Sequence, residues 1–92
     1  MGDVRGAVDE LAALLIDRIR VLGPDHPSTL STRYNLARYR GVVGDVQGAV
    51  DEFAALLVDQ VRVLGPDHLY TLSTRHHLAR WRGRGGGRRR RG

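Results

Sequence analysis

The sequence contains no cysteine, which excludes disulfide bonds, thiolate zinc sites and cysteine nucleophiles. It also lacks any apolar run near the roughly 20 residues that a membrane-spanning helix requires. No cationic start followed by an apolar signal core is present. From these absences we expect a soluble, cytoplasmic protein that has no membrane partner.

Lysine is absent as well, so all fifteen basic residues are arginine. Residues 1–82 contain ten arginines and ten acidic residues, a formal balance of zero. The sequence pI of about 11.0 therefore reflects a basic tail and not a basic folded surface. The arginines of this tail are Arg84, Arg88, Arg89, Arg90 and Arg91.

What the sequence does contain is an internal repeat with a period of 42 residues. Residues 2–41 align with residues 44–83 without a gap, and only ten of the forty aligned pairs differ. These pairs are Arg5/Gln47, Leu11/Phe53, Ile16/Val58, Arg18/Gln60, Ile19/Val61, Pro27/Leu69, Ser28/Tyr70, Tyr34/His76, Asn35/His77 and Tyr39/Trp81. Such self-similarity is typical of repeat architectures. We assign residues 1–83 to one repeat domain, and we expect residues 84–92, which have no apolar side chain to bury, to be disordered.

Hydrophobic periodicity predicts that each repeat is helical. Apolar residues recur at intervals of three and four in two long stretches. Asp3 and Asp45 are positioned to cap these two helices, and Gly-Pro pairs follow both of them. Pro27 suits the first position of a shorter helix. The sequence therefore predicts an all-α fold, with helices over residues 4–22, 27–40, 46–64 and 70–82.

The repeated motif resembles a known family. Residues 22–30 read Leu-Gly-Pro-Asp-His-Pro-Ser-Thr-Leu, and Asn-Leu-Ala and a Gly-Asp turn follow. This pattern resembles the 42-residue tetratricopeptide repeats (TPRs) of kinesin light chain, and more closely those of bacterial proteins that carry nucleotide-binding (NB-ARC) regulatory ATPases. The resemblance covers residues 2–83 and implies a TPR solenoid fragment of four antiparallel helices in the order B-A-B-A. Ala37, Ala49 and Phe53 fit the family's small and bulky positions, whereas Leu69 and His77 depart from the motif.

By the same resemblance, the A helices line a concave groove that holds an extended peptide. Arginine guanidinium groups suit carboxylates, so the groove is expected to favour acidic peptides or a free C-terminus. The chain is then a protein–protein interaction module that binds a peptide or another helical repeat. The alternative is that these residues form the solvated surface of helices whose other faces pack. The matching positions are Ser31, Tyr34, Asn35, Arg38, Ser73, His76, His77 and Arg80.

The four histidines do not predict a metal site. His76 and His77 are adjacent, so on a helix they point about 100° apart and do not share a metal easily. His26 and His68 recur at the same place in both repeats. We expect these two to bond to nearby backbone or acidic groups, and we expect no metal and no other cofactor.

Catalytic signatures are missing too. The Asp-Glu pair at residues 9–10 and its copy at 51–52 lie on the polar side of amphipathic helices, where a solvated face explains them. Ser31 and Ser73 have no nucleophile elbow around them. The glycines at 85–87 lack the strand and the Lys-Ser/Thr ending of a phosphate-binding loop. We therefore expect that the protein is not an enzyme.

Two alternative functions follow from the tail and from the truncated repeat pattern. Arg-Gly runs bind nucleic acid or other polyanions through charge and counterion release, so Arg84 and the arginines at 88–91 are candidate polyanion-binding residues. The tail has no aromatic residue for base stacking. The second alternative is that the chain is the remnant of a larger TPR regulatory protein.

The B-A-B-A order also predicts self-association. The first helix has no A helix before it, and the last has no B helix after it, so each has an unpaired face. Helix one of a second molecule is expected to dock on helix four of the first, giving a homodimer or a larger closed oligomer. The residues expected to lose exposure are Leu11, Leu15, Leu36, Leu78 and Trp81.

Overall fold

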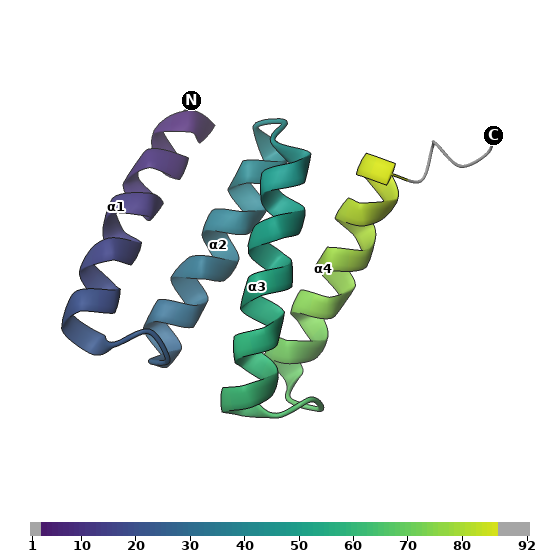
Figure 1. The fold of residues 1–92 in the computed structure, drawn as a ribbon. Coiled ribbons are helices and arrows are strands. Elements are labelled where there is room, and N and C mark those ends of the chain that lie inside the picture. Colours follow the sequence, from purple (N-terminus) through teal and green to yellow (C-terminus); the bar gives the residue numbers. More distant parts are fainter. Residues whose placement is uncertain (1–2, 87–92) are drawn as a thin grey trace.

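The computed structural model describes residues 3–86, and this part of the chain forms four helices joined by short turns (Figure 1). The helices are α1 (Val4–Leu22), α2 (Pro27–Val42), α3 (Val46–Leu64) and α4 (Leu69–Gly86). Successive helices run in opposite directions, and each packs on the next in one row with α1 and α4 at its two ends. None of these helices has the length and hydropathy needed to cross a membrane. The all-α prediction is confirmed.

Both long helices begin at the predicted aspartates. The Asp3 carboxylate accepts a hydrogen bond of 3.1 Å from the backbone N–H of Gly6. The Asp45 carboxylate accepts one of 2.9 Å from Gly48. Each bond satisfies one of the backbone donors that a helix start leaves unpaired. The two N-cap predictions are therefore confirmed.

The predicted ends of these helices are also confirmed. Gly23 follows α1 with a φ of 93°, and Gly65 follows α3 with a φ of 98°. This region of backbone space disfavours residues that carry a Cβ, so glycine is suited to both positions. The Gly23 N–H still donates to the Ile19 carbonyl at 3.0 Å before the chain turns away. Pro24 and Pro66 come next and do not continue the hydrogen-bond ladder.

The last helix is longer than the sequence predicts. We expected α4 to end near residue 82 and residues 84–92 to be disordered, but residues 84–86 are helical. The Arg84 guanidinium lies over the Trp81 ring, 4.8 Å from its centroid. Residues three apart share one face of a helix, so this cation–π contact supports the additional turn. Residues 87–92 lie outside the described part of the chain.

The core lies between α2, α3 and α4. Ala37, Ala49 and Phe53 are completely buried, and Leu78 joins them from α4. By contrast, α1 has no buried residue, because α2 is the only helix that packs extensively against it. This buried cluster is therefore centred on α3, which has α2 on one side and α4 on the other.

Two residues expected to become buried on self-association are already buried in the single chain. Leu36 on α2 is 2% exposed and Leu78 on α4 is 6% exposed, and Leu78 packs with Ala37, Ala49 and Phe53. Both α2 and α4 have a preceding helix on which this position can pack. The prediction that Leu36 and Leu78 lose exposure on assembly is therefore wrong.

Candidate functional site

The same Thr-Leu-Ser-Thr-Arg segment occurs near the start of α2 and of α4, and in α2 its two threonines bond to nearby backbone carbonyls. Thr29 Oγ1 donates to the Gly23 carbonyl at 2.8 Å, and Thr32 Oγ1 donates to the Ser28 carbonyl at 2.9 Å. Both threonines are buried, whereas Ser31 is exposed. The serine side of α2 is therefore left open to a ligand.

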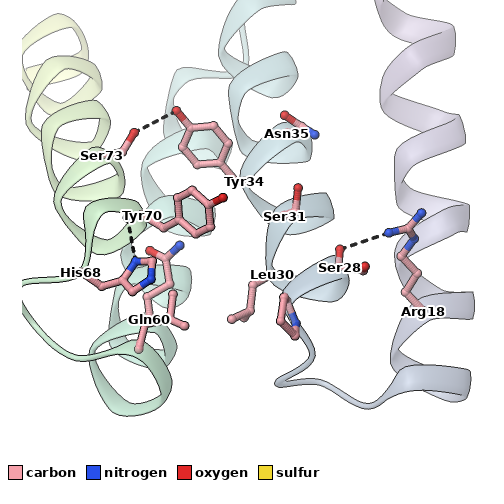
Figure 2. Close-up of a pocket in the computed structure, with 12 residues that line it drawn as sticks. Arg18, Ser28, Leu30, Ser31, Tyr34, Asn35, Gln60, His68, Tyr70 and Ser73 are labelled. Atoms are coloured by element: carbon pink, nitrogen blue, oxygen red, sulfur yellow. Dashed lines mark hydrogen bonds between the residues drawn. The ribbon is translucent and has the colours of Figure 1, made fainter.

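A cavity of about 610 Å³ lies on this open side, between α2 and α4 (Figure 2). Its volume is typical of sites that hold small ligands or peptide side chains. All four helices contribute to its walls. The lining residues are Arg18, Pro27, Ser28, Leu30, Ser31, Tyr34, Asn35, Gln60, Leu64, His68, Tyr70 and Ser73.

Four of the eight predicted peptide-binding residues line this cavity, namely Ser31, Tyr34, Asn35 and Ser73. The hydroxyls of Tyr34 and Ser73 share a hydrogen bond of 3.2 Å that joins α2 to α4 (Figure 2). The Tyr34 ring also meets the edge of Phe53 at a centroid distance of 5.8 Å. Tyr34 is thus held in place by two neighbouring helices and forms a rigid wall of the cavity.

The other four predicted residues do not line the cavity. Arg38, His76 and Arg80 are exposed and lie around His77, which is partly buried. The His77 ring stacks on Phe53 with centroids 5.6 Å apart and meets the edge of Tyr34 at 5.4 Å. Tyr34 therefore connects the cavity to a second group of residues, here called the basic cluster: Arg38, His76, His77 and Arg80.

Burial lowers the pKa of His77 below its usual value, and the positive charges of His76, Arg38 and Arg80 lower it further. The unfolded chain therefore binds a proton at this site, near a pKa of about 6.5, before the folded chain does. We expect the free energy of unfolding to be highest above that pH and to decrease as the pH falls below it. Thermal melts at pH 7.5 and 5.5 measure this loss.

The matched variant for this prediction is His77→Asn, since Asn35 occupies the same position in the other repeat. It is expected to show a smaller difference in melting temperature between the two pH values. His76→Asn serves as the comparison because it removes an exposed neighbour. A His77→Asn protein that keeps the full pH dependence would show that other groups cause it.

Eight lining residues were not predicted from the sequence, yet a signal for them was present. Seven of the twelve residues of the cavity occupy positions where the two repeats differ. Only a quarter of the eighty aligned residues do so. Divergence between the repeats is therefore concentrated around the cavity. The seven residues are Arg18, Pro27, Ser28, Tyr34, Asn35, Gln60 and Tyr70.

Gln60 is the most unusual of these residues. It is only 3% exposed, and its Oε1 atom is buried without a hydrogen-bond partner among the described residues. Tyr70, which is 62% exposed, extends from α4 toward α2 across the same space (Figure 2). The Gln60 oxygen is shielded from solvent, so of these two residues Tyr70 is the one that a ligand in the cavity can contact.

The only cation in the lining as described is Arg18 on α1, apart from the titratable His68. Its Nη1 lies 3.4 Å from the Ser28 carbonyl and donates to it. Arg18 and Gln60 are equivalent positions of the two repeats, so one copy supplies a charge and the other an amide. The cation in the cavity is therefore not one of the two arginines, Arg38 and Arg80, that the sequence suggested.

The two loop histidines act as helix caps. His26 Nδ1 accepts a hydrogen bond of 3.0 Å from the Ser28 N–H, and His68 Nδ1 accepts one of 3.0 Å from the Tyr70 N–H. The expected backbone bond of both residues is confirmed. Within residues 3–86, no three His, Asp or Glu side chains come together as a group of metal ligands. Of the candidate polyanion-binding residues, Arg84 lies on α4 and the arginines at 88–91 lie outside the described residues.

Comparisons with protein-family models, with curated proteins and with solved structures found no match.

Proposed function

We propose that this chain is a TPR-type protein–protein interaction module that binds an extended peptide along α2 and α4. Three features support the proposal. The 42-residue motif resembles TPRs through two copies. Consecutive antiparallel helices pack in one row, which is compatible with the order B-A-B-A. The cavity and the basic cluster lie along the same two helices, α2 and α4, which are the A helices in this assignment.

The observation that carries the proposal is the cavity between α2 and α4, which is lined by Tyr34 and by the largely exposed Tyr70. A peptide side chain placed in the cavity would contact both of these rings. Tyrosine suits such surfaces because it buries a large rigid area and keeps a polar edge.

Charge defines the class of peptide. The twelve described lining residues include no carboxylate, and Arg18 contributes a positive charge at one side. The basic cluster adds Arg38 and Arg80 farther along the same helices. A peptide with acidic residues, or with its C-terminal carboxylate near the basic cluster, matches this arrangement through charge-assisted hydrogen bonds.

The proposal is tested by selecting ligands from a library of random peptides that end in a free carboxylate. Fluorescence anisotropy then measures the affinity of the full chain and its variants for a selected peptide. Tyr70→Ser, which installs the residue found at position 28 of the other repeat, is expected to weaken binding tenfold or more. Arg38→Ala combined with Arg80→Ala is expected to weaken binding of acidic peptides and to leave the melting temperature unchanged, since both side chains are exposed.

Two controls separate the groove from the rest of the surface. Val58→Ser removes a largely exposed apolar side chain of α3 that does not line the cavity. Arg5→Ala removes a positive charge from α1. Both controls are expected to bind like the unmodified chain. Selected peptides whose affinity is unchanged by Tyr70→Ser and by the double arginine variant would contradict the proposal.

A further inference from the structure

The contact between α2 and α3 is held by ion pairs at three places along its length. Hydrogen bonds from Arg33, and secondly from Arg62, lower the pKa of the Asp59 carboxyl below its usual value. Arg62 reaches back to the turn before α2, where two hydrogen bonds hold Asp25. The pairs are Arg33 with Asp59 (2.6 Å), Arg40 with Glu52 (3.4 Å) and Arg62 with Asp25 (2.8 Å).

All six of these residues have identical counterparts in the other copy of the repeat. The counterparts do not meet each other, because three belong to α1 and three to α4 or the turn before it, at opposite ends of the row (Figure 1). Every one of them is exposed. They are Glu10, Asp17 and Arg20 at the α1 end, and Asp67, Arg75 and Arg82 at the α4 end.

Apolar residues show the same contrast. Leu56 of α3 is 0% exposed, whereas its counterpart Leu14 on α1 is 38% exposed. Helix α2 precedes α3 and packs on it, whereas no described helix precedes α1. Leu30 of α2 is 3% exposed, whereas Leu72 on α4 is 43% exposed, because α3 follows α2 and no described helix follows α4. The single chain therefore exposes one face of α1 and one face of α4, whose counterparts on α3 and α2 pack on each other within the chain.

Ala79 supports the same interpretation on α4. Its counterpart Ala37 is completely buried in the cluster with Ala49 and Phe53 of α3, but Ala79 is exposed. On α1, Asp17 and Arg20 already pair at 3.4 Å, as Asp59 and Arg62 do at 3.2 Å within the α2–α3 contact. Asp17 lacks the partner that Asp59 has in Arg33, and Arg20 lacks the partner that Arg62 has in Asp25. The α4 end carries the matching arginine and aspartate.

We propose that these two faces bind each other between molecules, so that α4 of one copy docks on α1 of the next and reproduces the α2–α3 contact. The intermolecular ion pairs are Arg75 with Asp17, Arg82 with Glu10, and Asp67 with Arg20. Leu14, Leu72 and Ala79 become buried in this interface, in place of Leu36 and Leu78. Because the contact joins two different faces, it leaves one free face at each end. Assembly therefore extends the row of helices or closes as a ring.

Charge reversal tests the proposal by sedimentation equilibrium on the full chain after nuclease treatment. The unmodified chain is expected to self-associate at micromolar concentration. Asp17→Arg alone sets Arg75 against an arginine, and Arg75→Glu alone sets Asp17 against a glutamate. Each single variant is expected to associate at least tenfold more weakly. Both substituted side chains are exposed, so circular dichroism should show unchanged helicity.

Recovery of association is the decisive outcome. An equimolar mixture of the two single variants is expected to assemble. Each contact between unlike chains brings opposite charges together at position 75 of one chain and position 17 of the other. The double variant Asp17→Arg/Arg75→Glu is expected to self-associate like the unmodified chain. Asp51→Arg makes the same charge change at an exposed position of α3 and should leave assembly unchanged. A monomeric unmodified chain, single variants that assemble normally, or no recovery in the mixture and in the double variant would each overturn the proposal.

Discussion

Replacing Phe53 with alanine is expected to lower the free energy of unfolding by about 3–5 kcal/mol. Phe53 is completely buried, and its ring contacts Tyr34 from α2 and His77 from α4. The loss combines the transfer free energy of the ring with a cavity that two rigid neighbours cannot readily fill. Small domains have total stabilities near the lower end of about 5–15 kcal/mol, so this variant should be largely unfolded in mild denaturant.

The repeat provides a matched control at the same position. Leu11→Ala on α1 removes a side chain that is only partly buried, from a helix with no buried residue. We expect a loss of about 1 kcal/mol, because less apolar area is removed from the interior. Urea denaturation followed by circular dichroism compares the two. Equal losses for the two variants would show that the core is not centred on α3.

Much of the fold was predictable from local chemistry. The spacing of apolar residues defines both long helices, and the Asp caps and Gly-Pro stops define their ends within a residue or two. These signals are local, since a cap or a stop acts within one turn. The end of α4 was not predictable in this way, because the contact of Arg84 with Trp81 opposes the poor helix propensity of the glycines that follow.

The site was harder to predict because it depends on how helices meet. Ser31, Tyr34, Asn35 and Ser73 were found from their positions in the motif. Gln60 is a polar residue on an amphipathic helix, and nothing in the apolar spacing indicates that neighbouring helices bury it. Arg38 and Arg80 were predicted from the same motif positions, whereas the cation beside the cavity is Arg18 on another helix.

Identical residues in the two repeats also have different surroundings, which periodicity alone does not reveal. Gly41 on α2 and Gly83 on α4 are aligned and both helical. Gly41 is buried beneath the ring of Trp81, which belongs to α4. The rest of α4 packs mainly on α3. Gly83 has open space where a Cβ would be placed. The same substitution at these two positions should therefore have opposite effects.

Gly41→Ala is expected to destabilise the protein, although alanine favours a helix. A Cβ at this position would lie 2.5 Å from Trp81 Cζ2 and 2.7 Å from Cε2, well inside van der Waals contact. Displacing the indole costs about 1–3 kcal/mol, as is typical for overpacking. This cost exceeds the gain of up to about 1 kcal/mol from helix propensity, so the melting temperature should fall.

Gly83→Ala meets no atom within 4 Å, so only the propensity gain is left, and the melting temperature should rise by the equivalent of about 0.5 kcal/mol. Trp81→Tyr installs the residue that the other repeat has at position 39. It should partly restore the stability lost in Gly41→Ala because the ring is smaller. A double-mutant cycle from thermal melts isolates this coupling between α2 and α4. If both glycine variants shift the melting temperature in the same direction, and the cycle shows no coupling, Trp81 does not pack on Gly41 in solution.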